Sequence, residues 1–183
     1  MPSSIISQGS DFWNGAHDRG DASMVLYGLS RFLLATGRTP DDGQNRLLNY
    51  CTAYIDSKIT PDGVVFSDTD ELENRISSGI NLNTSSLTYG GWRCYAALLE
   101  RMGDSEGAKR YIEKSEVLAE AIERYFGEVV SGYETYAYHK GCEVIRAWNC
   151  LPVYMGIENR ADATLEAIDS LLWSGGSCRT TEG

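Results

Sequence analysis

Apolar residues recur at the spacing of an α-helix in six segments of the chain. In the first, third and fifth segments they spread around much of the helix, which predicts inner helices that are buried on all sides. In the second, fourth and sixth segments they occupy one face, which predicts outer helices with a side open to water. The six segments are 21–36, 42–58, 83–102, 105–126, 143–155 and 160–173. The pattern predicts an all-α fold of about three αα-hairpins.

The connections between the segments are of two kinds. Each inner segment reaches its outer partner through a short turn that contains glycine and ends in Asp, Ser or Asn, as helix ends usually do. Each outer segment returns through a long connection rich in aromatic and acidic residues, such as 59–82 and 127–142. Because successive helices alternate in direction, we expect all long connections at one end of the domain, above the N-termini of the inner helices. Pro152 lacks an N–H group, so the fifth helix should kink or break there.

Composition narrows the range of partners. The 183 residues are 42% hydrophobic and carry a formal net charge of −10, which favours one domain over 1–183 and disfavours binding to nucleic acid or anionic lipid. The sequence has no apolar run of about 20 residues and no signal-peptide pattern, so we expect no membrane span and a cytoplasmic protein. Its five cysteines form no Cys-x-x-Cys pair, so neither a metal site nor another cofactor is expected.

Several short motifs, taken in order, resemble one enzyme family. The motifs are DGVVFSD at 62–68, LNTSSLTYGGW at 82–92, LLERMGD at 98–104 and RAWNCLP at 146–152. Together with the block 21–37 they resemble the six-hairpin glycosidases, and within them the glycogen-debranching and amylo-glucosidase-like enzymes. The resemblance implies an (α/α)6 toroid, of which this chain would span about the central three hairpins as an incomplete catalytic domain. It also implies a glycoside hydrolase that acts on an oligo- or polysaccharide, with inversion at the anomeric carbon.

Glycoside hydrolysis requires two carboxyl groups on opposite sides of the scissile bond. The acidic segment 68–75 is the best local source, because clustered carboxylates raise one another's pKa while a neighbouring arginine keeps one of them ionised. We expect Glu73 to be the general acid, with Asp70 and Glu71 as the next candidates, and Arg75 to contact substrate or a carboxylate. In the enzymes that the chain resembles, the second carboxylate lies much later, and Glu182 is the last candidate in this sequence.

Substrate contacts are expected in the same long connections. Aromatic side chains stack on the apolar faces of sugar rings, and charged side chains bind the hydroxyl groups. The run from His17 to Asp21 resembles the Arg-Asp pair with which related glucoamylases hold a terminal sugar, although Gly20 interrupts it. The expected substrate-binding residues, besides Arg75, are Trp13, His17, Asp18, Arg19, Asp21, Tyr138 and Glu143.

Two other functions fit the same pattern. Sugar epimerases and polysaccharide lyases use the same toroid with histidine, tyrosine or arginine as proton carriers, and here His17 and His139 would be the bases. A helical-repeat binding module without catalysis would instead need a large apolar groove for a protein partner.

Overall fold

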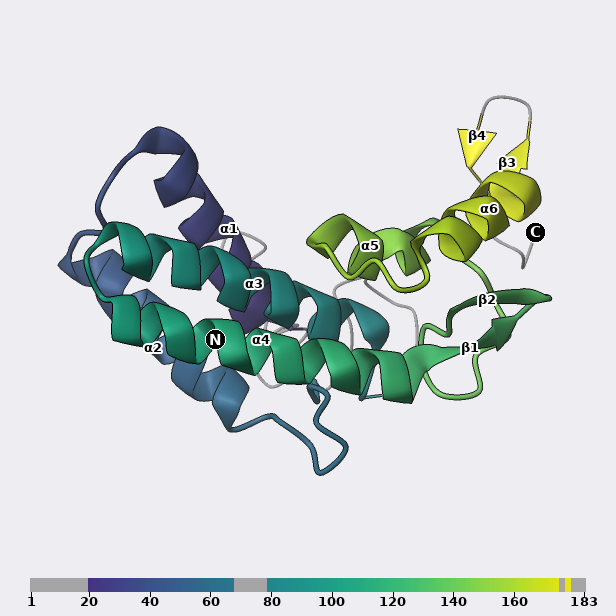
Figure 1. The fold of residues 1–183 in the computed structure, drawn as a ribbon, viewed down its shortest axis with the longest axis horizontal. Coiled ribbons are helices and arrows are strands. Elements are labelled where there is room, and N and C mark those ends of the chain that lie inside the picture. The colour runs from purple at the N-terminus through teal and green to yellow at the C-terminus, as the bar shows by residue number, and fades with distance from the viewer. Residues whose placement is uncertain (1–19, 68–78, 175–176, 179–183) are drawn as a thin grey trace, which may run out of the picture.

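The structure is a computed structural model, and it describes residues 20–67, 79–174 and 177–178. Helices dominate these residues, which confirms the all-α fold (Figure 1). In chain order the elements are α1 (Asp21–Thr36), α2 (Asp42–Asp56), α3 (Leu82–Arg101), α4 (Ser105–Phe126), β1 (Gly127–Val130), β2 (Tyr133–Tyr136), the 3₁₀-helix η3 (Ala147–Cys150), α5 (Leu151–Met155), α6 (Ala161–Leu172), β3 (Trp173–Ser174) and β4 (Ser177–Cys178).

In the first two hairpins, the helices end and begin at the turn residues that the sequence predicts. Gly37 ends α1 in the left-handed conformation, with φ of 68°, and its N–H donates to carbonyl groups of the last turn. Asp41 then begins α2 with a capping box, because its side chain accepts from the Gln44 N–H while the Gln44 side chain accepts from the Asp41 N–H. Asp104 caps α4 in a similar way by accepting from the Gly107 N–H at 2.9 Å.

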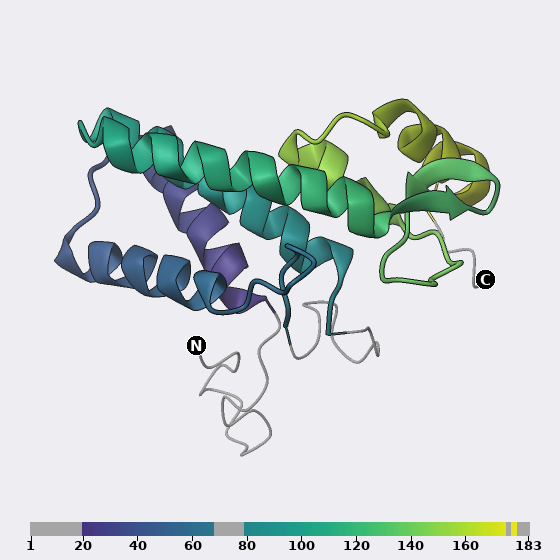
Figure 2. The same ribbon diagram turned by 60° about the horizontal axis from the view of Figure 1, so that its bottom comes forward.

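Helix α3 is the centre of the molecule. It packs against α1 and α4 along its length and also contacts α5, so most of its residues are buried, while Arg93, Ala97 and Glu100 leave one stripe of its C-terminal half exposed (Figure 2). Burial of the third segment is therefore confirmed. The first segment differs from expectation, because Met24 and Phe32 on α1 are 43% and 47% exposed. Helix α1 packs on α2 and α3, and its Arg31 donates to the Tyr154 hydroxyl of α5 at 3.0 Å.

The fifth segment is shorter than predicted. Residues 142–146 are not helical, so Glu143 does not begin a helix. The reason is local: the Asn149 side chain accepts from the Arg146 N–H at 3.0 Å and starts a 3₁₀ turn at Ala147. Pro152 lies in the first turn of α5, where its missing N–H costs nothing, and the change from 3₁₀ to α geometry occurs beside it. Helix α6 packs on η3 and β2.

A partly buried charged network joins the β1–β2 hairpin to α6. The Tyr136 hydroxyl donates to Glu123 Oε1, and Arg160 Nε donates to Glu123 Oε2 at 3.0 Å. Burial, together with the hydrogen bond to Glu123, raises the pKa of Tyr136 above its ordinary value. Gly127 makes room for this network, because a Cβ there would lie 2.7 Å from Arg160 Nε. The network therefore links α4, the hairpin and α6.

Two further expectations concern membranes and cysteines. Within the described ranges, no helix is long and apolar enough to cross a bilayer. Cys51, Cys94 and Cys142 are free thiols. Burial raises the pKa of the Cys51 thiol to about 11, so this side chain behaves as a small apolar residue of the core.

The network around Glu123 predicts a stability difference between two tyrosines of β2. Tyr136→Phe removes the donor to a partly buried carboxylate and should lower the free energy of unfolding by about 1 to 2 kcal/mol. Tyr133→Phe is the matched control, because its hydroxyl makes no hydrogen bond within the described residues, and it should change stability by less than about 0.5 kcal/mol. Urea denaturation followed by circular dichroism measures both. Equal effects of the two substitutions would contradict a stabilising role for the network.

Candidate functional site

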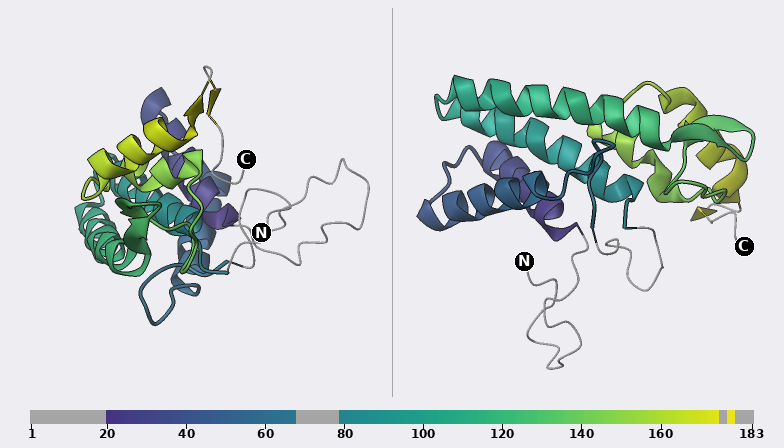
Figure 3. Two further views of the ribbon diagram at one scale, coloured as in Figure 1. Left: turned by 90° about the vertical axis from the view of Figure 1, so that its right-hand side faces the viewer. Right: turned by 90° about the horizontal axis from the view of Figure 1, so that it is seen from below.

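Three connections meet at the start of α3, and we call this region the loop end. It comprises residues 20–21, 57–67, 79–84 and 137–148. Asn81 caps α3 by accepting from the Thr84 N–H at 2.8 Å, and its Nδ2 donates to Ser67 Oγ at 3.0 Å. The Leu82 N–H donates to the Tyr138 carbonyl at 2.8 Å. Figure 3 shows the start of α1, the end of α2 and the start of α3 on the same side of the molecule, as the sequence predicts.

The start of α1 belongs to the same region. Gly20 has φ of 82°, and a Cβ at this position would lie 2.8 Å from Thr84 Oγ1. Only glycine fits here, because the backbone is left-handed and the Thr84 side chain is too close. This packing gives a physical reason for the glycine that interrupts the charged run before α1. Asp21 follows as the first residue of α1 and is half-buried.

A buried polar group without a partner lies in the first turn of α3. Asn83 is only 3% exposed, and its Oδ1 has no hydrogen-bond partner among the described residues. A buried acceptor without a donor costs about 1 to 3 kcal/mol, so such groups in native proteins usually serve a ligand or an ordered water. The neighbouring Asn81, in contrast, is fully bonded. Asn83 is therefore the described side chain that most clearly indicates a polar ligand at the loop end.

Tyr138, Arg146 and Trp148 form a second part of the loop end, the Arg-aromatic cluster. The Tyr138 and Trp148 rings meet edge to face with centroids 6.3 Å apart, and the Arg146 guanidinium lies 6.0 Å and 5.7 Å from the two centroids. Tyr138 is 2% exposed, while Arg146 and Trp148 are half-buried. Tyr138 is thus at the predicted end of the molecule, but the side chains of the cluster that a ligand could reach are Arg146 and Trp148.

Glu143 and His139 lie at the edge of this region. Glu143 is exposed and lines a polar cavity of about 370 Å³ with Glu128 and Ser131 of the β1–β2 hairpin. His139 is half-buried, packs edge to face on Tyr138 at 6.4 Å, and its Nδ1 lies 3.2 Å from the Lys140 carbonyl. The structure therefore brings Asp21 and Tyr138 to the loop end and directs Glu143 toward the hairpin.

The remaining expected site residues lie outside the described residues. They are the catalytic candidates Asp70, Glu71 and Glu73 and the binding candidates Trp13, His17, Asp18, Arg19 and Arg75. The two residues that flank the acidic segment are described, and they are joined: the Ser67 N–H donates to the Gly79 carbonyl at 2.7 Å. Both flanking residues belong to the loop end. The segment thus leaves and re-enters the described fold beside Asn81.

Sequence reasoning missed Asn83 and Arg146 as site residues. A signal for Asn83 was present in the sequence. The polar residues 83–86 stand at the start of a helix that the apolar pattern predicts to be buried on all sides, and a buried amide usually has a hydrogen-bond partner. Arg146 carried no such signal, since an arginine in a predicted helix is ordinarily solvated. Among the described side chains, no group of three or more histidine, cysteine or acidic residues is arranged to hold a metal ion.

Comparison with protein-family models finds no match for this chain, and comparison with curated proteins finds none either. The described part of the loop end contains backbone and side-chain polar groups at the start of a buried helix, the buried acceptor Asn83 Oδ1, which has no partner there, and an arginine that lies against two aromatic rings. Such a surface suits a ligand with hydroxyl donors and an apolar face.

The two buried asparagines of α3 predict opposite responses to the same substitution. Asn83→Leu removes an acceptor that has no partner, so the free energy of unfolding should stay unchanged or rise by up to about 1 kcal/mol. Asn81→Leu removes the helix cap and the bond to Ser67, and should cost about 2 kcal/mol or more. Thermal and urea denaturation of the pair measures the difference. If Asn83→Leu destabilises as much as Asn81→Leu, the Asn83 carbonyl is satisfied within the fold and does not mark a ligand site.

Proposed function

We propose that this chain binds an oligo- or polysaccharide at the loop end and hydrolyses one of its glycosidic bonds. The observation that carries the proposal is the buried acceptor Asn83 Oδ1 beside the capped start of α3. A sugar hydroxyl is a donor that would satisfy this acceptor. Consecutive αα-hairpins with their long connections at one end agree with the six-hairpin toroid that the sequence resembles.

The binding part of the proposal assigns two kinds of contact. Asn83 and Asp21 accept hydrogen bonds from sugar hydroxyl groups at the start of α3 and α1. Trp148, half-buried in the Arg-aromatic cluster, offers an apolar surface to a sugar ring, and Arg146 donates to hydroxyl groups beside it. Trp13, His17, Asp18 and Arg19 complete the set that the sequence predicts.

The catalytic part of the proposal rests on the acidic segment between Ser67 and Gly79. Glu73, protonated by the repulsion of its acidic neighbours, gives its proton to the leaving glycosidic oxygen, and Arg75 keeps a neighbouring carboxylate ionised. A second carboxylate removes a proton from the water that attacks the anomeric carbon from the opposite face, so the configuration inverts. The joined flanks of the segment at the loop end support this assignment.

The proposal predicts a selective loss of turnover in Glu73→Gln. Removal of the general acid should lower kcat on maltooligosaccharides or glycogen by about 10²-fold or more while KM changes little, because binding does not need the proton. Release of reducing sugar measures kcat. Glu120→Gln is the control, since it makes the same change on the exposed side of α4 and should leave kcat unchanged.

Two outcomes would contradict the hydrolase. If Glu73→Gln, Asp70→Asn and Glu71→Gln all retain full turnover while His17→Ala and His139→Ala abolish it, the chain acts by proton transfer beside a carbonyl, as an epimerase or lyase does. If the chain releases no product from any saccharide tested but binds saccharide through Asn83 and Trp148, it is a binding module.

A further inference from the structure

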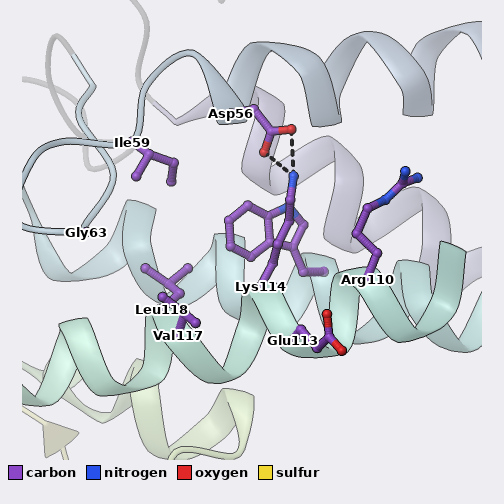
Figure 4. A pocket seen from close by; sticks show the side chains of 9 residues that line it. Asp56, Ile59, Gly63, Arg110, Glu113, Lys114, Val117 and Leu118 are labelled. Carbon is purple, nitrogen blue, oxygen red and sulfur yellow. Dashed lines mark hydrogen bonds and ion pairs between the residues drawn. The ribbon is translucent and has the colours of Figure 1, made fainter. Parts of the chain in front are cut away.

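A second cavity lies between the C-terminal part of α2, the connection that follows it, Trp92 of α3 and the middle of α4, and its Ile59 and Gly63 belong to the connection that also contributes to the loop end. We call it the Trp92 groove. Its volume is about 350 Å³, which is within the range of about 300 to 1,000 Å³ typical of small-molecule sites. Figure 4 shows Ile59, Val117 and Leu118 along its walls and Lys114 reaching from α4 to Asp56. The residues that line it include Asp56, Ile59, Trp92, Lys114, Val117 and Leu118.

The walls of the Trp92 groove are apolar and partly open to water. Val117 is 65% exposed and Ile59 is 38% exposed, although both border a concave surface. Leu118, which lies deeper, is 2% exposed. Apolar surface in a concave position gains most when a ligand covers it, because water there is replaced by close contacts on several sides. The groove therefore favours a ligand with an apolar body.

The groove also contains a buried donor without a partner. Trp92 is 3% exposed, and its Nε1–H has no hydrogen-bond partner within the residues that the structure describes. Buried indole N–H groups usually have an acceptor, because an unmet donor is costly. The Lys114 ammonium lies 5.5 Å from the indole centroid and 5.1 Å from that of Tyr111, which holds the ring in place by cation–π contacts. A ligand for this groove should therefore bring one acceptor.

The charges around the groove indicate whether the acceptor of the ligand should be neutral or anionic. Lys114 is already paired with Asp56, since its Nζ lies 2.7 Å and 2.6 Å from the two carboxylate oxygens. The other two charged residues of the lining, Arg110 and Glu113, are of opposite sign, so the four charges cancel. An anion gains no net attraction there, and the −10 charge of the chain repels it. A neutral carbonyl oxygen meets the indole N–H without this cost.

We propose that the Trp92 groove is a second binding site, which takes a neutral small molecule with an apolar body and one carbonyl-type acceptor. The site differs from the proposed saccharide site in its lining, which is mostly apolar and comes from α2, α3, α4 and the connection 57–67. Saccharides, whose surfaces carry many hydroxyl groups, would leave most of their donors unmet against Ile59, Val117 and Leu118.

Three probes of similar shape test the proposal on the whole chain. Acetophenone carries a neutral carbonyl acceptor, ethylbenzene has no acceptor, and benzoate is an anion. Acetophenone should bind at least tenfold more tightly than either of the others. It should also shift the Nε1–H resonance of Trp92 in a ¹⁵N–¹H spectrum; since the chain has four tryptophans, Trp92→Phe identifies that resonance by its loss.

Substitution of an exposed residue in the wall of the Trp92 groove tests whether acetophenone binds there. Val117→Asp places a charge in the apolar wall and should weaken acetophenone binding at least tenfold. Val129→Asp is the matched control, because Val129 is 64% exposed on β1 outside the groove, and it should leave the affinity unchanged. Equal affinity for acetophenone and ethylbenzene, binding that leaves the Trp92 resonance in place, or no binding of acetophenone up to its solubility would each overturn the proposal. None of these results depends on saccharide hydrolysis.

Discussion

The hydrogen bonds of Asn81 at the start of α3 hold the loop end together. One side chain caps the most buried helix of the molecule and, through Ser67, also ties the connection from α2 to it. Both bonds are buried, so neither competes with water once formed. The Tyr138 carbonyl adds the connection from the β1–β2 hairpin to the next residue, Leu82. Two loops that are distant in sequence thus depend on the geometry of one helix end.

Close packing around α3 makes this arrangement possible. Gly91 allows Leu26 of α1 to approach, since a Cβ there would lie 3.3 Å from a Leu26 methyl carbon. Ser23 and Thr88 hydroxyls, 2.7 Å apart, bridge α1 and α3 deeper in the interior. Small and hydroxylated residues on α3 therefore serve contact between helices, and polar character in a buried helix is not by itself a sign of a site. Asn83 differs because its carbonyl has no partner among the described residues.

Two surfaces with different chemistry lie on this scaffold, and the connection 57–67 borders both of them. The loop end offers polar groups and a half-buried arginine beside aromatic rings, which suits a hydroxylated ligand. The Trp92 groove offers apolar walls and a single indole donor, which suits a mostly apolar one. A buried acceptor at Asn83 in the first and a buried donor at Trp92 in the second have no hydrogen-bond partner among the described residues. These two atoms make the two surfaces distinguishable by experiment.

The helical segments with strong apolar periodicity were determined by the sequence itself. The bounds of α1 and α4 agree with the pattern, because a local cap or turn residue such as Gly37 or Asp104 ends or begins each of them. The non-helical form of 142–146 could not be predicted, since it depends on the Asn149 side chain, which also donates to the Tyr136 carbonyl of a separate strand. The exposure of Met24 and Phe32 likewise depends on which helices pack around α1. Periodicity indicates which residues can be buried and where a helix can end. The neighbours of each helix are decided only when distant segments pack together. That packing also decides that Asn83 Oδ1 and Trp92 Nε1 have no hydrogen-bond partner among the described residues.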